Sequence, residues 1–205
     1  MRDIYLAGGC FWGVEHFFRQ FDGVTLTEVG YANGPEGAPT YEEVCASSGH
    51  AETVRVGYDD NKISLEELLL YYFRIIDPVS VNRQGNDVGV QYRTGIYYTD
   101  EEQLPQIQQV YDRERQKVAQ PLAVEVAPLR NFYRAEEYHQ DYLVKNPGGY
   151  CHIPSKMFEL GTGTHERRIR CGLNLGTRIE YETGRRVLGS KDNGTRGLLH
   201  RNALP

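Results

Sequence analysis

One cysteine, set between glycines and large aromatic residues, is the first position in this chain that is suited to chemistry. Cys10 follows Gly8-Gly9 and precedes Phe11-Trp12-Gly13, which contains the only tryptophan. A thiolate is a strong nucleophile, and a helix start stabilises it through the helix dipole and unpaired backbone N–H groups. The large rings indicate an apolar pocket beside it. From spacing alone, a nucleophile and a small buried hydrophobic residue explain Cys10 equally well.

The chain around Cys10 predicts a strand-to-helix turn that would position the thiol. Residues 4–7 are typical of a short buried strand, and Gly8-Gly9 interrupt it. Residues 14–21 then carry apolar side chains at helical spacing. We therefore expect Cys10 at the junction of the two elements.

The remaining pattern predicts a mixed α/β chain. Strands are expected at 24–31, 53–58, 94–98 and 122–127, and helices at 65–76, 100–118 and 135–144. Ser64 and Glu67 have the spacing of a capping box for the first of these helices. The polar, Gly-containing segments 32–50 and 82–93 are predicted as long loops that carry functional side chains. The expected fold class is α/β (α+β), a two-layer plait with a mixed β-sheet packed by helices.

Size and charge distribution predict one catalytic domain followed by an extension. The chain has 205 residues, 40% of them hydrophobic, enough for one well-buried domain, which we place at 1–154. Residues 155–205 contain ten Lys or Arg against five Asp or Glu and show little apolar periodicity. We interpret this segment as a basic, poorly ordered extension. A nucleic-acid-binding arm is the alternative, although few aromatic residues are present for base stacking.

The whole-chain composition excludes several classes of partner. A formal charge of −5 gives no general attraction to nucleic acid or to an anionic membrane. No signal peptide and no apolar stretch of membrane-spanning length is evident, so we expect a cytoplasmic protein. The four cysteines do not have the spacing of a disulfide scaffold or a zinc site, so no bound metal is expected. We also expect a monomer.

Several ordered segments resemble the peptide methionine sulfoxide reductase A family. Gly9-Cys10-Phe11-Trp12-Gly13 is similar to the active-site signature of that family. Further similar segments, in family order, are Tyr41-Glu42-Glu43-Val44-Cys45, Gly49-His50-Ala51-Glu52, Gly85-Asn86-Asp87-Val88-Gly89-Val90-Gln91-Tyr92-Arg93, Tyr138-His139-Gln140-Asp141-Tyr142-Leu143 and Asn146-Pro147-Gly148-Gly149-Tyr150-Cys151. The resemblance covers residues 1 to about 154.

The resemblance implies a role for each matching position. Cys10 attacks the sulfoxide sulfur and Glu52 donates a proton to the oxygen. The other assigned positions bind substrate: Phe11 and Trp12 seat the S-methyl group, Tyr41 and Tyr92 hydrogen-bond the oxygen, and Asp87 orients the substrate. Read without the family, Glu52 is a solvated strand-edge carboxylate, the tyrosines are ordinary packing residues, and Asp87 belongs to a turn.

The implied reaction is reduction of methionine S-sulfoxide, both free and in proteins. It leaves a sulfenic acid on Cys10, which a resolving thiol converts to a disulfide. The resemblance places that thiol at Cys151, and thioredoxin, or dithiothreitol in an assay, re-reduces the pair; no cofactor is bound. Cys45 is expected to be a buried packing residue. Cys171 lies twenty residues after Cys151, outside the matching segments, and receives no role.

Two other functions remain open from the residues alone. A cysteine acyl-transfer enzyme would pair Cys10 with a histidine such as His16, His50 or His139, for which structural roles are preferred. A thiol redox sensor would form a regulatory disulfide between Cys10 and Cys151 without repairing a substrate. A sensor needs neither a methyl pocket nor an acid, so the constellation of Cys10, Phe11, Trp12 and Glu52 favours the reductase.

Overall fold

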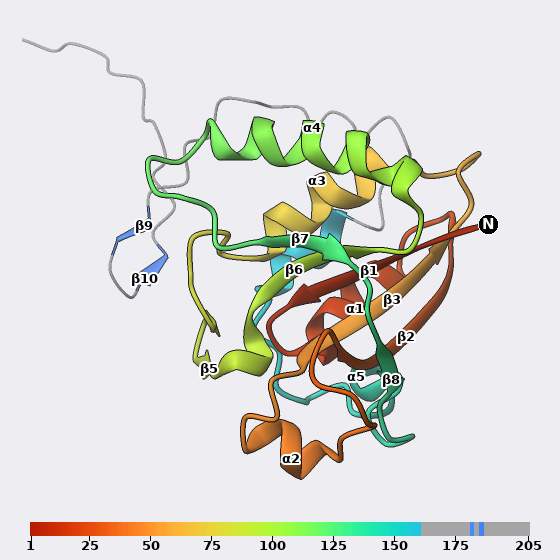
Figure 1. The fold of residues 1–205 in the computed structure, drawn as a ribbon, viewed down its shortest axis with the longest axis vertical. Coiled ribbons are helices and arrows are strands. Elements are labelled where there is room, and N and C mark those ends of the chain that lie inside the picture. The colour runs from red at the N-terminus through yellow and green to blue at the C-terminus, as the bar shows by residue number, and fades with distance from the viewer. Residues whose placement is uncertain (161–180, 183–184, 187–205) are drawn as a thin grey trace, which may run out of the picture. The chain divides into compact units, whose positions relative to one another are not determined.

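The computed structural model describes residues 1–160, 181–182 and 185–186 (Figure 1). The chain divides into two compact units, Met1–Gly172 and Leu173–Pro205. In the second unit, the described strands β9 (Tyr181–Glu182) and β10 (Arg185–Arg186) pair in antiparallel orientation. All other described elements belong to the first unit. In the described ranges, none of the helices is both long and apolar enough to cross a membrane.

A six-stranded mixed sheet forms the centre of the first unit. Its order is β7 (Glu125–Pro128), β6 (Thr94–Tyr98), β1 (Arg2–Gly8), β3 (Ala51–Tyr58), β2 (Val24–Ala32) and β8 (Phe132–Arg134). The β6–β7 pair is parallel, and the other pairs are antiparallel. The predicted fold class, a mixed sheet packed by helices, is therefore confirmed.

Side chains alternate between the two faces of each strand, and they form a large hydrophobic core and a smaller hydrophobic cluster. Ile4 and Leu6 of β1 face the main core, with Val54 and Val56 of β3. Side chains at the intervening positions, such as Tyr5 and Ala7, belong to a second cluster with Ala32, Ala51 and Tyr97. Because side chains of a strand alternate between faces, Glu52 lies on the same face as Val54 and Val56, the face of the main core.

Two helices supply the other half of the main core. α1 (Phe11–Arg19) and α3 (Leu65–Ile75) contribute most of their apolar side chains to it. The predicted capping box at the start of α3 is confirmed, since Ser64 accepts the Glu67 N–H and Glu67 accepts the Ser64 N–H. α4 (Leu104–Arg115), which follows the 3-10 turn Glu101–Gln103, lies beside α3 and adds Ile107 and Val110 (Figure 1).

Three predictions of secondary structure were wrong, and one of them is the loop predicted at 82–93, which contains the short strands β4 (Arg83–Gln84) and β5 (Asp87–Val88) and a 3-10 turn. The segment 32–50 is not loop throughout, because α2 (Tyr41–Cys45) forms behind a Thr40 capping box. The helix predicted at 135–144 is reduced to the single turn α5 (Tyr142–Lys145). Hydrogen bonds to distant residues form here in place of helical ones. The Gln140 side chain accepts from the Val29 N–H and donates to the Val29 carbonyl. The backbone at Asp141 is left-handed, with φ 54°, which interrupts a helix.

Short elements complete the described chain after α3 and after α5. β4 (Arg83–Gln84) and β5 (Asp87–Val88) form a small hairpin, followed by the 3-10 turn Val90–Tyr92. After Cys151, the 3-10 segment Ser155–Leu160 brings Met157 and Phe158 against the main core. Most of the predicted extension, 161–180, 183–184 and 187–205, lies outside the described residues, and so does Cys171.

Candidate active site

The turn between β1 and α1 presents Cys10 as predicted. Gly9 has φ +86°, and a Cβ there would come within 2.6 Å of the Gln84 Cβ, so the turn requires glycine for both reasons. Cys10 occupies the N-cap position of α1. The positive end of the α1 dipole therefore lies beside the thiol.

The Cys10 thiol is buried, and this burial outweighs the effect of the helix. Its exposure is 7%, and burial together with the nearby Glu52 carboxyl raises the pKa of Cys10, while the Trp12 backbone N–H lowers it. The expected stabilisation of the thiolate by the helix start is present but is not the dominant effect. The uncomplexed protein therefore holds Cys10 as a thiol at neutral pH.

Glu52 lies next to Cys10 at the start of β3. Its side chain is 2% exposed, which excludes a solvated strand-edge carboxylate. The Phe11 N–H donates to Glu52 Oε2 at 3.0 Å, so the carboxyl is held against the first turn of α1. Burial raises the pKa of Glu52 to about 8, although the Phe11 bond lowers it. At neutral pH this group is a protonated acid beside a thiol.

The two aromatic residues after Cys10 occupy different environments. Phe11 is only 1% exposed, and its ring contacts Tyr31 and His139 within the core. Trp12 remains partly exposed and is fixed on two sides. Its indole N–H donates to His139 Nδ1 at 3.0 Å, and its ring stacks on Tyr142 with a centroid distance of 3.7 Å. Trp12 thus provides an immobilised aromatic surface close to the thiol.

Tyr41, the first residue of α2, joins the same cluster. Its ring meets the edge of His139 at a centroid distance of 4.5 Å, and its pKa is raised by burial, by a hydrogen bond with Cys45 and by the nearby Glu52. Cys45 itself is exposed, so the prediction of a buried packing residue was wrong. The reason is that α2 is a five-residue surface helix of which only Val44 is buried.

Asp87 and Tyr92 approach the thiol from the segment between α3 and β6. Burial and the Glu52 and Cys10 side chains raise the pKa of the Tyr92 hydroxyl. Asp87 accepts a hydrogen bond from the Tyr150 hydroxyl at 3.1 Å. Burial raises the pKa of Asp87, and this effect outweighs the lowering by the Tyr150 bond. Because Asp87 in turn raises the pKa of both Cys10 and Glu52, all four groups share one site.

Cys151 lies over the first turn of α1. A Cβ placed on Gly13 would be 3.0 Å from Cys151 Sγ, so the missing side chain of Gly13 leaves room for this thiol. Cys10, Cys45 and Cys151 are all free thiols. The next residue, His152, holds the segment around Cys151 in place, because its Nε2 lies within hydrogen-bond distance, 3.0 Å, of the Gly8 carbonyl oxygen. The second thiol is therefore held close to the turn that carries the first.

Sequence reasoning did not assign several side chains that build this site. Glu136 accepts the Tyr31 hydroxyl at 2.7 Å and the Tyr41 N–H at 2.9 Å. The others are His139, Tyr142, Tyr150 and His152, described above. All five lie in or close to the segments 138–143 and 146–151 that resemble the family. That proximity was the only signal in the sequence that could have marked them as site residues.

Three of the described histidines, His50, His139 and His152, bond partners other than Cys10. His139 accepts from Trp12, His152 bonds the Gly8 carbonyl, and His50 lies between Ser48 and the Pro35 carbonyl. Burial lowers the pKa of each of them and of His16. Among the described residues, no histidine forms a hydrogen bond with the Cys10 thiol, as the Cys/His pair of an acyl-transfer enzyme would require.

The geometry defines a class of protein. A buried thiol beside a protonated carboxyl, a fixed indole surface and a second free thiol are the parts of a thiol-dependent oxidoreductase. Within the ranges described, no three His, Cys, Asp or Glu side chains are grouped to hold a metal ion.

Comparison with known proteins identifies the family. The model of the peptide methionine sulfoxide reductase family matches residues 2–167. Peptide methionine sulfoxide reductase MsrA of Clostridium acetobutylicum is 54% identical over 160 residues, which cover 78% of this chain and 99% of that protein. The chain belongs to the peptide methionine sulfoxide reductase A family and is a thiol-dependent methionine sulfoxide reductase.

Solved structures agree with this assignment. Mxr1 of Saccharomyces cerevisiae in its reduced form superposes with a TM-score of 0.71 at 39% identity, covering 75% of this chain and 92% of that one. Methionine sulfoxide reductase A of Corynebacterium diphtheriae gives a TM-score of 0.71 at 36% identity, covering 75% and 82%. The predicted family and activity are therefore confirmed.

Proposed function

We propose that this enzyme reduces methionine S-sulfoxide, free and in proteins, by nucleophilic attack of Cys10 on the sulfoxide sulfur. The observation that carries the proposal is the buried, protonated Glu52 next to a buried thiol. Cys10 donates an electron pair to sulfur while Glu52 gives its proton to the oxygen. The attack forms an S–S bond, and the protonated oxygen then moves with its bonding electron pair to the Cys10 sulfur as that S–S bond breaks. Methionine leaves with the electron pair of the S–S bond, Cys10 is left as a sulfenic acid, and the proton lost from the thiol restores the Glu52 acid.

The surrounding side chains bind and orient the substrate. The S-methyl group packs on Trp12, with Phe11 behind the turn, and the sulfoxide oxygen accepts from the hydroxyls of Tyr41 and Tyr92. Asp87 orients the substrate. Burial raises the pKa of both tyrosines, so they remain hydrogen-bond donors at all physiological pH values.

Cys151 resolves the sulfenic acid. Its thiol attacks the Cys10 sulfur, water leaves, and a Cys10–Cys151 disulfide forms. The position of Cys151 over Gly13 supports this role. A dithiol must then reduce the disulfide, and we propose thioredoxin as that external reductant, with no bound cofactor. We also propose a cytoplasmic monomer without nucleic-acid or membrane partners, and a catalytic domain at 1–154 followed by an extension.

The test supplies racemic methionine sulfoxide with dithiothreitol to the wild type and to Cys10→Ser, Glu52→Gln and Cys151→Ser. Turnover is expected to vanish in Cys10→Ser, and undiminished turnover there would refute the nucleophile. With thioredoxin as reductant, Cys151→Ser is expected to release about one methionine per enzyme and then stall, because only resolution is lost. Repeated turnover of that variant with thioredoxin would reject the role of Cys151.

A further inference from the structure

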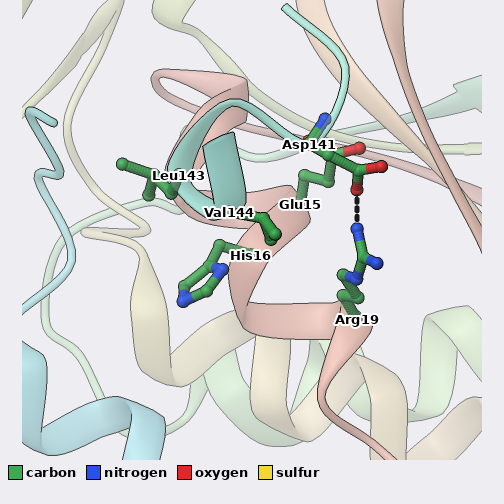
Figure 2. A pocket seen from close by; sticks show the side chains of 6 residues that line it. All are labelled: Glu15, His16, Arg19, Asp141, Leu143 and Val144. Atoms are coloured by element: carbon green, nitrogen blue, oxygen red, sulfur yellow. Dashed lines mark hydrogen bonds and ion pairs between the residues drawn. The ribbon is translucent and has the colours of Figure 1, made fainter. Parts of the chain in front are cut away.

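A buried carboxyl that the proposed reaction does not use lies one turn beyond Trp12. Glu15 is on the same helix, and its side chain is only 2% exposed. Figure 2 shows Glu15 and Arg19 both pointing from α1 toward Asp141. Charged side chains are rarely buried without a specific partner, so the contacts of Glu15 indicate what it does.

Glu15 holds the backbone of Asp141. Its Oε2 accepts the Asp141 N–H at 2.9 Å, and the Arg19 guanidinium forms an ion pair with the Asp141 carboxylate (Figure 2). Asp141 has a left-handed backbone, φ 54°, and its carbonyl accepts the N–H groups of Val144 and Lys145, both at 3.0 Å. This conformation is unfavourable for a residue with a side chain. The contacts from α1 therefore fix the point at which α5 begins.

The anchored segment in turn fixes Trp12. Tyr142, the residue after Asp141, stacks on the Trp12 ring with an interplanar angle of 13°, and His139 accepts the indole N–H. Trp12, Glu15 and Arg19 are spaced i, i+3 and i+7, so one face of α1 contacts His139, Asp141 and Tyr142. Movement of Asp141 would consequently displace the ring that packs on Trp12.

We propose that Glu15 is a positioning residue for sulfoxide reduction: by holding the Asp141 backbone it sets Tyr142 against Trp12 and so fixes the indole surface on which the substrate S-methyl group packs. The proposal rests on the substrate role of Trp12 given under the proposed function. The required feature of Glu15 is a hydrogen-bond acceptor of its size. Burial raises the pKa of Glu15 to about 7, and both the acid and the carboxylate retain an acceptor oxygen.

The test compares Glu15→Gln, which keeps an acceptor, with Glu15→Leu, which keeps volume alone. Trp12 is the only tryptophan, so intrinsic fluorescence reports its surroundings directly and without an activity assay. Glu15→Gln is expected to keep the wild-type emission and a KM for methionine sulfoxide within about twofold. Glu15→Leu is expected to shift the emission and raise KM about five- to tenfold, with kcat changed less than about threefold.

Two further variants keep the proposal falsifiable. Tyr142→Leu, which leaves Glu15 and Asp141 in place, is expected to reproduce the shifted emission and raised KM, and adding Glu15→Leu to it should have little further effect. Ser64→Ala destabilises α3 without contact to Trp12 and should leave both readouts unchanged. Wild-type emission and KM in Glu15→Leu, a Gln variant that behaves like Leu, or equal changes in Ser64→Ala would each overturn the proposal. Failure of the proposed function is distinct, since the wild type would then not reduce methionine sulfoxide.

Discussion

At the scale of single residues, two buried groups hold their protons in the resting enzyme. Burial raises the pKa of the Cys10 thiol above its usual value and that of Glu52 to about 8, so the carboxyl loses its proton first as the pH rises. Catalysis requires the reverse state, with a thiolate and a protonated acid. The relative order of these two pKa values sets the shape of the pH–rate profile.

This order predicts different profiles for the wild type and Glu52→Gln. Below about pH 8, the single-turnover rate of methionine release should rise with pH, because the thiolate fraction grows while Glu52 stays protonated. Above about pH 8 the wild-type rate should level off, since each gain in thiolate is offset by loss of the acid. Glu52→Gln should be about 10²- to 10⁴-fold slower, and its rate should keep rising. Rapid-quench measurements would show this, and a plateau at the same pH in both proteins would contradict the acid role.

Sequence reasoning predicted these residues because each lies within a short local motif. Cys10, Glu52 and Cys151 could be assigned roles from their motifs, and the Gly9 turn follows from local backbone rules. The contact between His152 and the Gly8 carbonyl could not be predicted, since it joins positions 144 residues apart. The burial of Glu52 also depends on which face of β3 meets α1, a tertiary property.

At the scale of elements, a helix was predicted correctly where hydrogen bonds between residues close in sequence determine it, and incorrectly where bonds to distant residues do. The capping box of Ser64 and Glu67 predicted α3 correctly, because both of its bonds are local. The same type of signal was present at Thr40 and Glu43 and would have revealed α2. The helix predicted at 135–144 failed because the Gln140 side chain bonds β2 and Asp141 is held by α1.

The capping boxes at Thr40 and Ser64 allow a controlled comparison, because one caps the helix that carries Tyr41 and the other caps α3. Thr40 Oγ1 accepts the Glu43 N–H at 3.3 Å, and the helix it caps begins with Tyr41. A five-residue helix is unstable on its own, so Thr40→Ala should loosen α2 and raise KM about threefold while costing about 1 kcal/mol. Ser64→Ala should cost a similar free energy of unfolding and leave KM unchanged. Steady-state kinetics with urea unfolding would measure both; equal KM values would show that α2 does not position Tyr41.

At the scale of the whole molecule, the end of the catalytic domain can be tested by truncation. Phe158 contacts His16 and Phe17 of α1, and Met157 packs on the same core, so residues 155–160 contribute buried apolar surface. A chain ending at 160 should retain full turnover with dithiothreitol. A chain ending at 154, the predicted boundary, should fold with about 1 to 3 kcal/mol less stability because this packing is lost. Loss of activity in the 1–160 chain would show that later residues belong to the domain.

The pH dependence of stability also belongs to the whole molecule, because buried groups in several elements contribute with opposite signs. Burial lowers the pKa of His16, His50, His139 and His152, the last to about 4. Below the unfolded histidine value of 6.5, the unfolded chain binds more protons at these groups, so they make stability rise with pH. Glu15 and Glu52 have raised pKa values of about 7 and about 8, so above 4.5 the folded chain binds more protons there and stability falls with pH.

These contributions oppose one another between about pH 4.5 and 6.5, and only the glutamates act between 6.5 and 8. We therefore expect the free energy of unfolding to be greatest near pH 6.5 and to decrease by about 1 kcal/mol per pH unit up to about pH 8. Urea titrations across this range would measure the slope. Glu52→Gln removes the group with the higher of these two pKa values and should flatten the decrease between pH 7 and 8. An unchanged slope in that variant would mean that Glu52 is already ionised in the folded protein, and the proton it is proposed to donate would have to come from elsewhere.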